Sequence, residues 1–214
     1  MDCVYVHGFG ENLGGKRVRL IVDALEKAGY GCDVPDLHRP SFREVTISAA
    51  LEGLEQVLRR WQGDGPRLLI GASMGGYVAT RWAMAHGDWN GRLMLLAPGM
   101  GMAGRWPILV GEERMERWEN EGLLRLPGPS ERLEAVEWGF VQDMREQPAV
   151  ERVPQGTVII HGRRDRTVPI DISRRLSKCS GGAWLLEVQD GHALMQSLDI
   201  VIEEALDILG SKER

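Results

Sequence analysis

Short apolar runs alternate along this chain with longer segments in which apolar residues recur every three or four positions. Several of the runs are apolar almost throughout, which is typical of strands buried on both faces of a parallel sheet. An alternation of this kind predicts an α/β fold, a doubly wound and mostly parallel sheet of about six strands with helices on both faces. The predicted strands are 3–6, 31–34, 67–71, 92–97, 157–160 and 183–188.

Three of the intervening segments are amphipathic and predict helices. Their apolar residues share one helical face at 18–28, at 47–61 and at 198–209, and a glycine follows the first and the third. Ser41 and Glu44 have the spacing of a capping box ahead of the second helix, which we expect to begin there or a few residues later.

The segment between Ala97 and Thr157 interrupts the alternation. It is about sixty residues long, has no good strand candidate, and is divided by Pro127-Gly128-Pro129. Long excursions in compact α/β domains are usually functional lids. We therefore expect one domain over 1–214 with a helical lid or cap insertion at 99–152, and the alternative is a pair of ordinary helices packed on the sheet. The residues with helical spacing are Met115, Trp118, Leu133, Val136, Phe140, Val141 and Met144.

The composition is that of an ordinary soluble globular protein, with 43% hydrophobic and 27% charged residues. A formal net charge of -5 and a pI near 5.6 disfavour a nucleic acid or an anionic membrane surface as the main partner. The three cysteines form no CxxC pair, the N-terminus does not have the pattern of a signal peptide, and no apolar run approaches the ~18 residues of a membrane span. We therefore expect a cytoplasmic protein.

One motif directly follows an apolar run and directly precedes a helical segment: Gly71-Ala72-Ser73-Met74-Gly75, which reads G-x-S-x-G. A nucleophilic serine needs this context, because it occupies a sharp strand-to-helix turn in which larger flanking residues would collide. The motif predicts Ser73 as a nucleophile. The alternative is a tight turn in a dinucleotide-binding unit, but the glycines do not have G-x-G-x-x-G spacing and no acidic residue closes the next strand.

A serine nucleophile needs a base, and the chain offers five histidines. His192 lies just after the last predicted strand, where a loop delivers it to the same edge of the sheet as the serine. His38 and His86 lie on a loop and at a helix end without such a context. His7 and His161 each precede a glycine at the end of a strand, where we expect them to shape a turn. His192 is therefore the predicted base.

The acid that orients the base is predicted to be Asp165, which follows the penultimate strand. The resulting order along the chain, serine, aspartate, histidine, is the order of hydrolases built on such a sheet. Asp190 is the main competitor, but its place two residues before His192 is awkward for a hydrogen bond to the ring. The other alternative for Asp165 is a surface ion pair with its three arginine neighbours.

The same edge of the sheet should hold an oxyanion hole made of two backbone N–H groups. One is expected from Met74, which follows the nucleophile, and the other from Phe9, in the loop after the first strand. The alternative for this loop is a phosphate-binding turn. However, Gly8, Gly10 and Gly14 do not have dinucleotide spacing, and no P-loop lysine follows them.

Four motifs in this order carry a resemblance to the α/β-hydrolase superfamily. They are His7-Gly8-Phe9, the Gly71–Gly75 turn, His161-Gly162-x-x-Asp165-x-x-Val168-Pro169 and Gly191-His192. With YVHGF at its start and GASMGGY at the turn, the chain is similar to small bacterial esterases of the UPF0227 (YqiA-like) kind. The resemblance implies a compact form of the fold, in which the first two strands of the full fold are absent.

The expected reaction is two-step acyl transfer through an acyl-enzyme, with Asp165 holding the His192 imidazole. A carboxylic ester of a small to medium acyl group is the expected substrate, but a thioester, an activated amide or a carbon–carbon bond could use the same triad. A non-catalytic scaffold that binds a ligand or a protein is the alternative from another class. Neither a metal nor a cofactor is expected, and the oligomeric state stays open. The residues expected to bind substrate are Gly10, Met100, Trp106, Trp138 and Val168.

Overall fold

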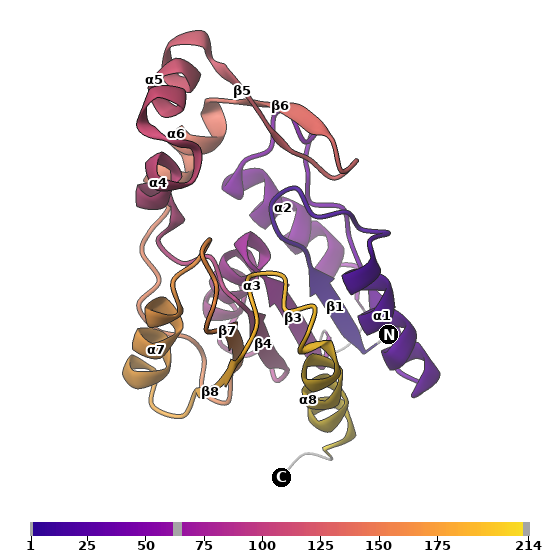
Figure 1. The fold of residues 1–214 in the computed structure, drawn as a ribbon. Helices are drawn as coiled ribbons and strands as arrows, with labels where there is room; N and C mark the ends of the chain where they lie inside the picture. Colours follow the sequence, from indigo (N-terminus) through magenta and orange to yellow (C-terminus); the bar gives the residue numbers. More distant parts are fainter. Residues whose placement is uncertain (1, 62–65, 212–214) are drawn as a thin grey trace.

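A computed structural model describes residues 2–61 and 66–211. Its centre is a six-stranded sheet with the strand order β2-β1-β3-β4-β7-β8, in which every neighbouring pair is parallel (Figure 1). This arrangement confirms the predicted parallel sheet of about six strands. The strands are β1 (Cys3–Val6), β2 (Cys32–Asp33), β3 (Leu68–Ala72), β4 (Arg92–Leu96), β7 (Val158–Gly162) and β8 (Trp184–Val188).

The central strands are largely apolar because both of their faces are covered. Along β3, Leu69 belongs to the core on one face of the sheet, whereas Leu68 and Ile70 belong to the core on the other face, and all three are fully buried. Successive side chains of a strand point to opposite faces. Burial on both faces therefore explains why these runs lack the alternation of a half-exposed strand.

Helices cover both faces, so the sheet is doubly wound as predicted. Two helices, α1 (Lys16–Lys27) and α8 (Leu198–Gly210), contribute side chains to the core of one face. The opposite core contains residues of α2 (Ile47–Leu58), α3 (Met74–Ala85) and α7 (Ile170–Cys179).

The second helix begins later than the spacing of Ser41 and Glu44 alone would place it. Those two residues hydrogen-bond to each other in a turn, but the helix starts at Ile47. Its cap is Thr46, whose hydroxyl accepts a hydrogen bond from the backbone N–H of Ala49.

The insertion between β4 and β7 is not wholly helical, and this corrects the sequence-based expectation. Leu133 and Val136, predicted on a helix, lie on a strand of an antiparallel hairpin. On the other strand of this hairpin, Leu124 and Leu126 are buried while Arg125 is exposed. This alternation has a period of two, but the segment is too short for that period to be distinguished from helical spacing in the sequence. The elements of the insertion are η1 (Met102–Arg105), α4 (Trp106–Val110), α5 (Glu112–Glu121), β5 (Leu123–Pro127), β6 (Leu133–Glu137) and α6 (Gly139–Glu146).

The insertion gathers at one end of the sheet, where α6 contacts α2 (Figure 1). Its buried side chains are continuous with the core on the α2–α3 face of the sheet. Within the described residues, no helix has both the length and the apolar character that crossing a membrane requires.

Candidate active site

Ser73 occupies the turn between β3 and α3, on the sharp strand-to-helix connection that its motif predicts. Its backbone has φ 51° and ψ -116°, a strained conformation for a residue with a side chain. Two glycines permit the turn. A Cβ atom at Gly75 would lie 2.0 Å from the Val6 carbonyl oxygen, and one at Gly71 would lie 2.7 Å from the Gly75 carbonyl oxygen. The packing of α3 against the sheet therefore excludes side chains at both positions.

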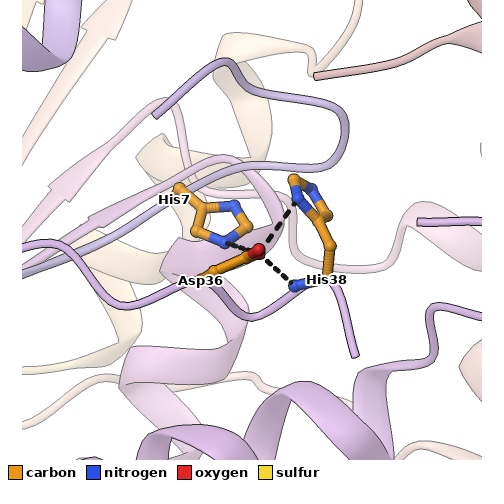
Figure 2. A group of neighbouring side chains, drawn as sticks. All are labelled: His7, Asp36 and His38. Carbon is orange, nitrogen blue, oxygen red and sulfur yellow. Dashed lines mark hydrogen bonds and ion pairs between the residues drawn. The ribbon is translucent and has the colours of Figure 1, made fainter. Parts of the chain in front are cut away.

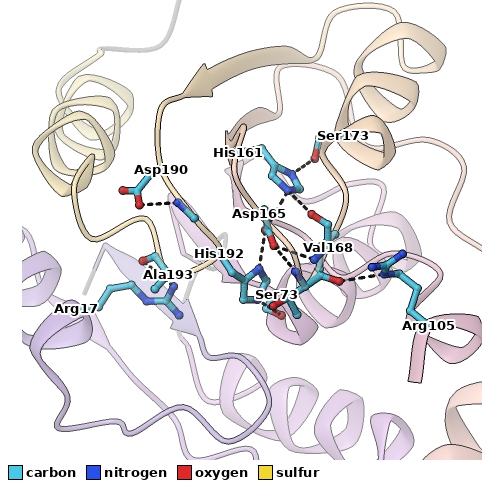
Figure 3. A network of polar contacts seen from close by, with 12 residues as sticks. Arg17, Ser73, Arg105, His161, Asp165, Val168, Ser173, Asp190, His192 and Ala193 are labelled. Carbon is cyan, nitrogen blue, oxygen red and sulfur yellow. Dashed lines mark hydrogen bonds and ion pairs between the residues drawn. The ribbon is translucent and has the colours of Figure 1, made fainter. Parts of the chain in front are cut away.

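A chain of hydrogen bonds joins Ser73, His192 and Asp165 (Figure 3). The Ser73 hydroxyl donates to His192 Nε2 over 3.0 Å, and His192 Nδ1–H donates to Asp165 Oδ2 over 2.7 Å. His192 reaches the site from the loop between β8 and α8, and Asp165 from the loop after β7. The arginines beside Asp165 do not neutralise it: Arg163, for example, pairs with Glu187.

The Asp165 carboxylate is fully buried yet carries its charge at neutral pH. Burial by itself would raise the pKa of this carboxyl, but hydrogen bonds from His161 and His192 hold it far below its ordinary value. Oδ1 accepts the backbone N–H groups of Thr167 and Val168 over 2.8 and 2.9 Å. The carboxylate is therefore fixed in orientation and ionised, which suits it to align the His192 ring.

His161 fixes the same loop from inside the core. Its ring is fully buried, and Nε2–H donates to the Val168 carbonyl oxygen over 2.9 Å while lying 3.2 Å from Asp165 Oδ2. Because Nε2 carries the proton, Nδ1 accepts the hydroxyl hydrogen of Ser173 over 2.6 Å. The contact between His161 and Asp165 is one that sequence reasoning missed. The expected turn-shaping role pointed toward it, because His161 lies four residues before Asp165.

Asp190, the competitor of Asp165, does not contact the His192 ring (Figure 3). Its carboxylate accepts the backbone N–H groups of Gly191, Gln196 and Ser197 over 2.7, 2.6 and 2.9 Å. It therefore holds the loop that carries His192 and leaves the ring to Asp165.

The predicted oxyanion groups lie beside Ser73 on two different segments. The loop after β1 approaches so closely that a Cβ atom at Gly8 would lie 3.3 Å from Ser73 Cβ. In residues 2–61 and 66–211, the backbone N–H groups of Phe9 and Met74 have no hydrogen-bond acceptor. Free N–H groups next to a nucleophile are the requirement of an oxyanion hole.

A cavity of about 300 Å³ opens beside Ser73 and His192, between the body and the insertion. Its wall is mainly apolar, which is typical of pockets that bind small molecules. A second, more open cavity of about 340 Å³ adjoins the same two residues on the side of α1 and includes Asn12 and Lys16. The apolar residues of the first wall are Phe9, Ile47, Met74, Tyr77, Met102, Ala103, Trp106, Leu109, Phe140, Met144, Pro148 and Ala149.

Of the five residues expected to bind substrate, only Trp106 lines this cavity. Met100, Trp138 and Val168 are 3%, 7% and 0% exposed and pack into the interior. Gly10 lies against the hairpin, where a Cβ atom would be 2.5 Å from the Pro127 carbonyl oxygen. The expectation that all five residues line the pocket is therefore corrected. For Met100 and Trp138 the reason is that Met and Trp at helical spacing are more often core residues than pocket residues.

Sequence reasoning missed several residues of the wall. Tyr77 lies one helical turn after Ser73, and Phe140 and Met144 are four positions apart on α6. The spacing of the last two predicted a helix, and that helix is present. The spacing alone could not show that the helix face shared by these two residues lines the cavity beside Ser73.

Among the described residues, one group of side chains has the composition of a metal site: His7, Asp36 and His38 (Figure 2). The lone pair of His7 Nε2, however, already accepts the Leu37 backbone N–H over 2.8 Å, and His7 Nδ1–H donates to the Gly8 carbonyl oxygen. Burial also lowers the pKa of His7, so the ring is neutral. His7 is therefore occupied by hydrogen bonds to its own backbone surroundings and offers no free lone pair to a metal ion.

Comparison with known families gives one match over nearly the whole chain. Residues 2–199 match the uncharacterised protein family UPF0227. Among characterised proteins, the pimeloyl-[acyl-carrier protein] methyl ester esterase of Vibrio atlanticus (strain LGP32) is 26% identical over 217 residues, which covers 83% of this chain and 81% of the esterase.

Solved structures share the fold at lower sequence identity. The alpha/beta hydrolase domain-containing protein 10 from mouse superposes with a TM-score of 0.74 at 17% identity, covering 98% of this chain and 89% of the mouse chain. Est1E from Butyrivibrio proteoclasticus superposes with a TM-score of 0.73 at 18% identity, covering 98% and 88%. At these identities the likeness establishes the α/β-hydrolase fold alone.

Proposed function

The chain belongs to the UPF0227 family, with the α/β-hydrolase fold that its motifs predicted, and we propose that it is a serine hydrolase of carboxylic esters. The observation that carries the proposal is the continuous hydrogen-bonded chain from Ser73 through His192 to Asp165. A serine–histidine–aspartate chain with this chemistry is the arrangement that activates a serine hydroxyl for acyl transfer.

The reaction begins when Ser73 Oγ attacks the ester carbonyl. His192 Nε2 takes the hydroxyl proton, and the ionised Asp165 stabilises the positive imidazolium that results. The carbonyl oxygen becomes negative and is bound by the N–H groups of Phe9 and Met74. Each such donor contributes about 3–4 kcal/mol to transition-state stabilisation in comparable sites.

The intermediate then collapses, and His192 returns its proton to the leaving alcohol. A water molecule enters, loses a proton to His192 and attacks the acyl-enzyme, which releases the acid and restores Ser73. Apart from this water molecule, none of these steps needs a group beyond the side chains and backbone of this chain. We therefore propose an enzyme that works without a metal or an organic cofactor.

The shape and chemistry of the cavity support an ester of a small to medium acyl group as the substrate. The wall offers Trp106, Phe140 and Met144 to an apolar chain whose carbonyl lies at Ser73. The characterised relative from Vibrio acts on a methyl ester, according to its name, and this favours an ester bond over other bonds. A thioester remains the second candidate, because it would place the same carbonyl at the same donors.

We also propose that the insertion serves as a lid. Its residues supply one side of the cavity wall, while the body supplies Ser73 and His192 on the other side. Exclusion of water by such a cover strengthens the electrostatic interactions at the reacting carbonyl.

The test is the hydrolysis of p-nitrophenyl esters from acetate to decanoate by the wild type and by Ser73→Ala. We expect the wild type to prefer short to medium chains and Ser73→Ala to lose at least ~10³-fold in kcat, because it lacks the nucleophile. Ser211→Ala, which changes an exposed serine far from the site, serves as the control and should retain wild-type rates.

A fluorophosphonate probe provides a second measurement that does not depend on the choice of ester. The wild type should be labelled at Ser73 and the folded Ser73→Ala variant should not. A wild type that is neither labelled nor active would contradict the proposal and favour a non-catalytic, ligand-binding scaffold.

A further inference from the structure

The loop after β1 is held by the carboxylate of Glu11. Gly8 donates its N–H to Glu11 Oε2 over 2.9 Å, and the Gly8 carbonyl oxygen accepts the Glu11 N–H over 3.3 Å and His7 Nδ1–H over 2.9 Å. The carbonyl and N–H of a trans peptide point to opposite sides. Because the Gly8 carbonyl oxygen is held by two donors, the direction of the Phe9 N–H is fixed as well.

Glu11 is in turn held by two side chains. Its Oε1 accepts the Tyr5 hydroxyl over 3.0 Å, Arg17 Nε–H over 2.9 Å and Arg17 Nη2–H over 2.6 Å. Burial raises the pKa of Tyr5 far above its usual range, so its hydroxyl keeps the proton that it donates. The Glu11 and Arg17 side chains are only 11% and 15% exposed. Little water competes for this ion pair, which makes its geometry directional and strong.

The third donor of Arg17 reaches the other side of the site. Arg17 Nη1–H donates to the Ala193 carbonyl oxygen over 3.2 Å, and Ala193 directly follows His192 (Figure 3). One guanidinium on α1 therefore binds the loop after β1 through Glu11 and the loop after β8 directly. These two loops are more than 170 positions apart in the chain, and β1 and β8 are separated by three strands in the sheet.

We propose that Glu11 and Arg17 are positioning residues, which hold the Phe9 N–H and the His192 ring in register with each other across Ser73. The inference rests on the proposed function, because it assigns the pair a task in that reaction. Both residues act through others: neither supplies a proton or a donor to the reacting carbonyl. Their substitution should therefore slow the chemical step more than it weakens substrate binding.

The variant that tests this is Arg17→Met, which keeps the aliphatic stem and removes all three donors. We expect kcat to fall roughly 10- to 100-fold, with KM changing less than about threefold, because the Phe9 N–H and the His192 ring lose their alignment. Arg17→Lys keeps the charge but offers one ammonium in place of a planar guanidinium. It should therefore be more thermally stable than Arg17→Met without recovering the wild-type kcat. Arg19→Met, on an exposed position of the same helix, is the matched control.

Amide hydrogen exchange supplies a readout that does not require activity. In Arg17→Met, peptides that cover 7–12 and 190–197 should both exchange faster than in the wild type and in Arg19→Met. Wild-type kcat in Arg17→Met or full recovery of kcat in Arg17→Lys would overturn the positioning role, as would faster exchange in only one loop. A wild type that is inactive and unlabelled by the fluorophosphonate would overturn the proposed function itself, whatever the exchange of the loops.

Discussion

At the scale of single residues, hydrogen-bond partners divide the histidines into different roles. His192 has a serine on one ring nitrogen and a carboxylate on the other, whereas His161 is surrounded by core and orients the carboxylate from behind. His38 has neither arrangement. It is 6% exposed, its Nδ1 lies 3.4 Å from Asp36 Oδ1, and its Nε2 has no partner in the described part of the chain.

His38 makes the stability of the fold sensitive to mild acid. Burial, and then the neighbouring His7, lowers the pKa of His38 to about 4, from an ordinary value of about 6.5. In the unfolded chain, His38 therefore binds a proton below about pH 6.5, whereas in the folded chain it binds that proton only below about pH 4. The free energy of unfolding should fall as the pH drops through this window.

Between pH 7 and pH 5, the free energy of unfolding of His38→Leu should fall by about 1–2 kcal/mol less than that of the wild type. The variant has no titrating ring at this position and no unpartnered nitrogen, so its stability at pH 7 should be at least that of the wild type. Urea unfolding at both pH values measures the difference. His86→Gln, on a more exposed histidine, is the control, and an equal loss in wild type and His38→Leu would refute the assignment.

At the scale of elements, the position of Ser73 depends on how closely α3 packs on the sheet. The helix begins directly after the serine, and a Cβ atom on its second residue, Gly75, would collide with the carbonyl oxygens of Val6, in β1, and of His7, which follows β1. Any side chain at Gly75 would push α3 away from β1. Ser73 and the loop after β1 would then separate.

Gly75→Ala tests this contact. An added Cβ would lie 2.0 Å from the Val6 carbonyl oxygen, so we expect a loss of at least ~2 kcal/mol in the free energy of unfolding. Labelling of Ser73 by a fluorophosphonate should fall by at least tenfold in any folded fraction. Gly87→Ala, which meets no atom within 4 Å, is the matched control and should be nearly neutral in both measurements.

At the scale of the whole molecule, the cavity exists because two parts of the chain meet over Ser73. Phe9, from the loop after β1, stacks on Phe140 of α6 with ring centroids 4.7 Å apart and meets Trp106 of α4 edge-on at 5.5 Å. This aromatic cluster joins the insertion to the body. Side chains of the insertion therefore shape the cavity beside Ser73.

Shortening one such side chain should change the preferred substrate. Met144→Ala removes a partly exposed side chain of the cavity wall, so we expect kcat/KM for octanoyl relative to butyryl esters to rise about fivefold to tenfold. Met84→Ala changes a 52% exposed methionine of α3 that is not part of the wall, and it should leave the ratio unchanged. An unchanged ratio in Met144→Ala would show that the acyl chain lies elsewhere, with the second cavity as the next candidate.

Much of this architecture could be predicted from local patterns. Runs such as Leu68–Ala72 are apolar because both of their faces are buried. The glycines of the G-x-S-x-G motif are present because the turn has no room for a larger residue at either position. Asp165 and His192 followed from their places after strands that end at one edge of a parallel sheet. The hairpin was missed because five-residue strands contain too few positions to separate a period of two from helical spacing.

The sequence by itself determined the parallel sheet, the helices on its two faces and the three residues that meet at its carboxyl edge. These features depend on periodicity and on steric limits, which are properties of neighbouring residues. Only the tertiary structure decided which apolar side chains line the cavity, how His161 supports Asp165, and how Glu11 and Arg17 join two distant loops. Contacts of that kind depend on the distances between segments that are far apart in the chain, and no local pattern encodes those distances.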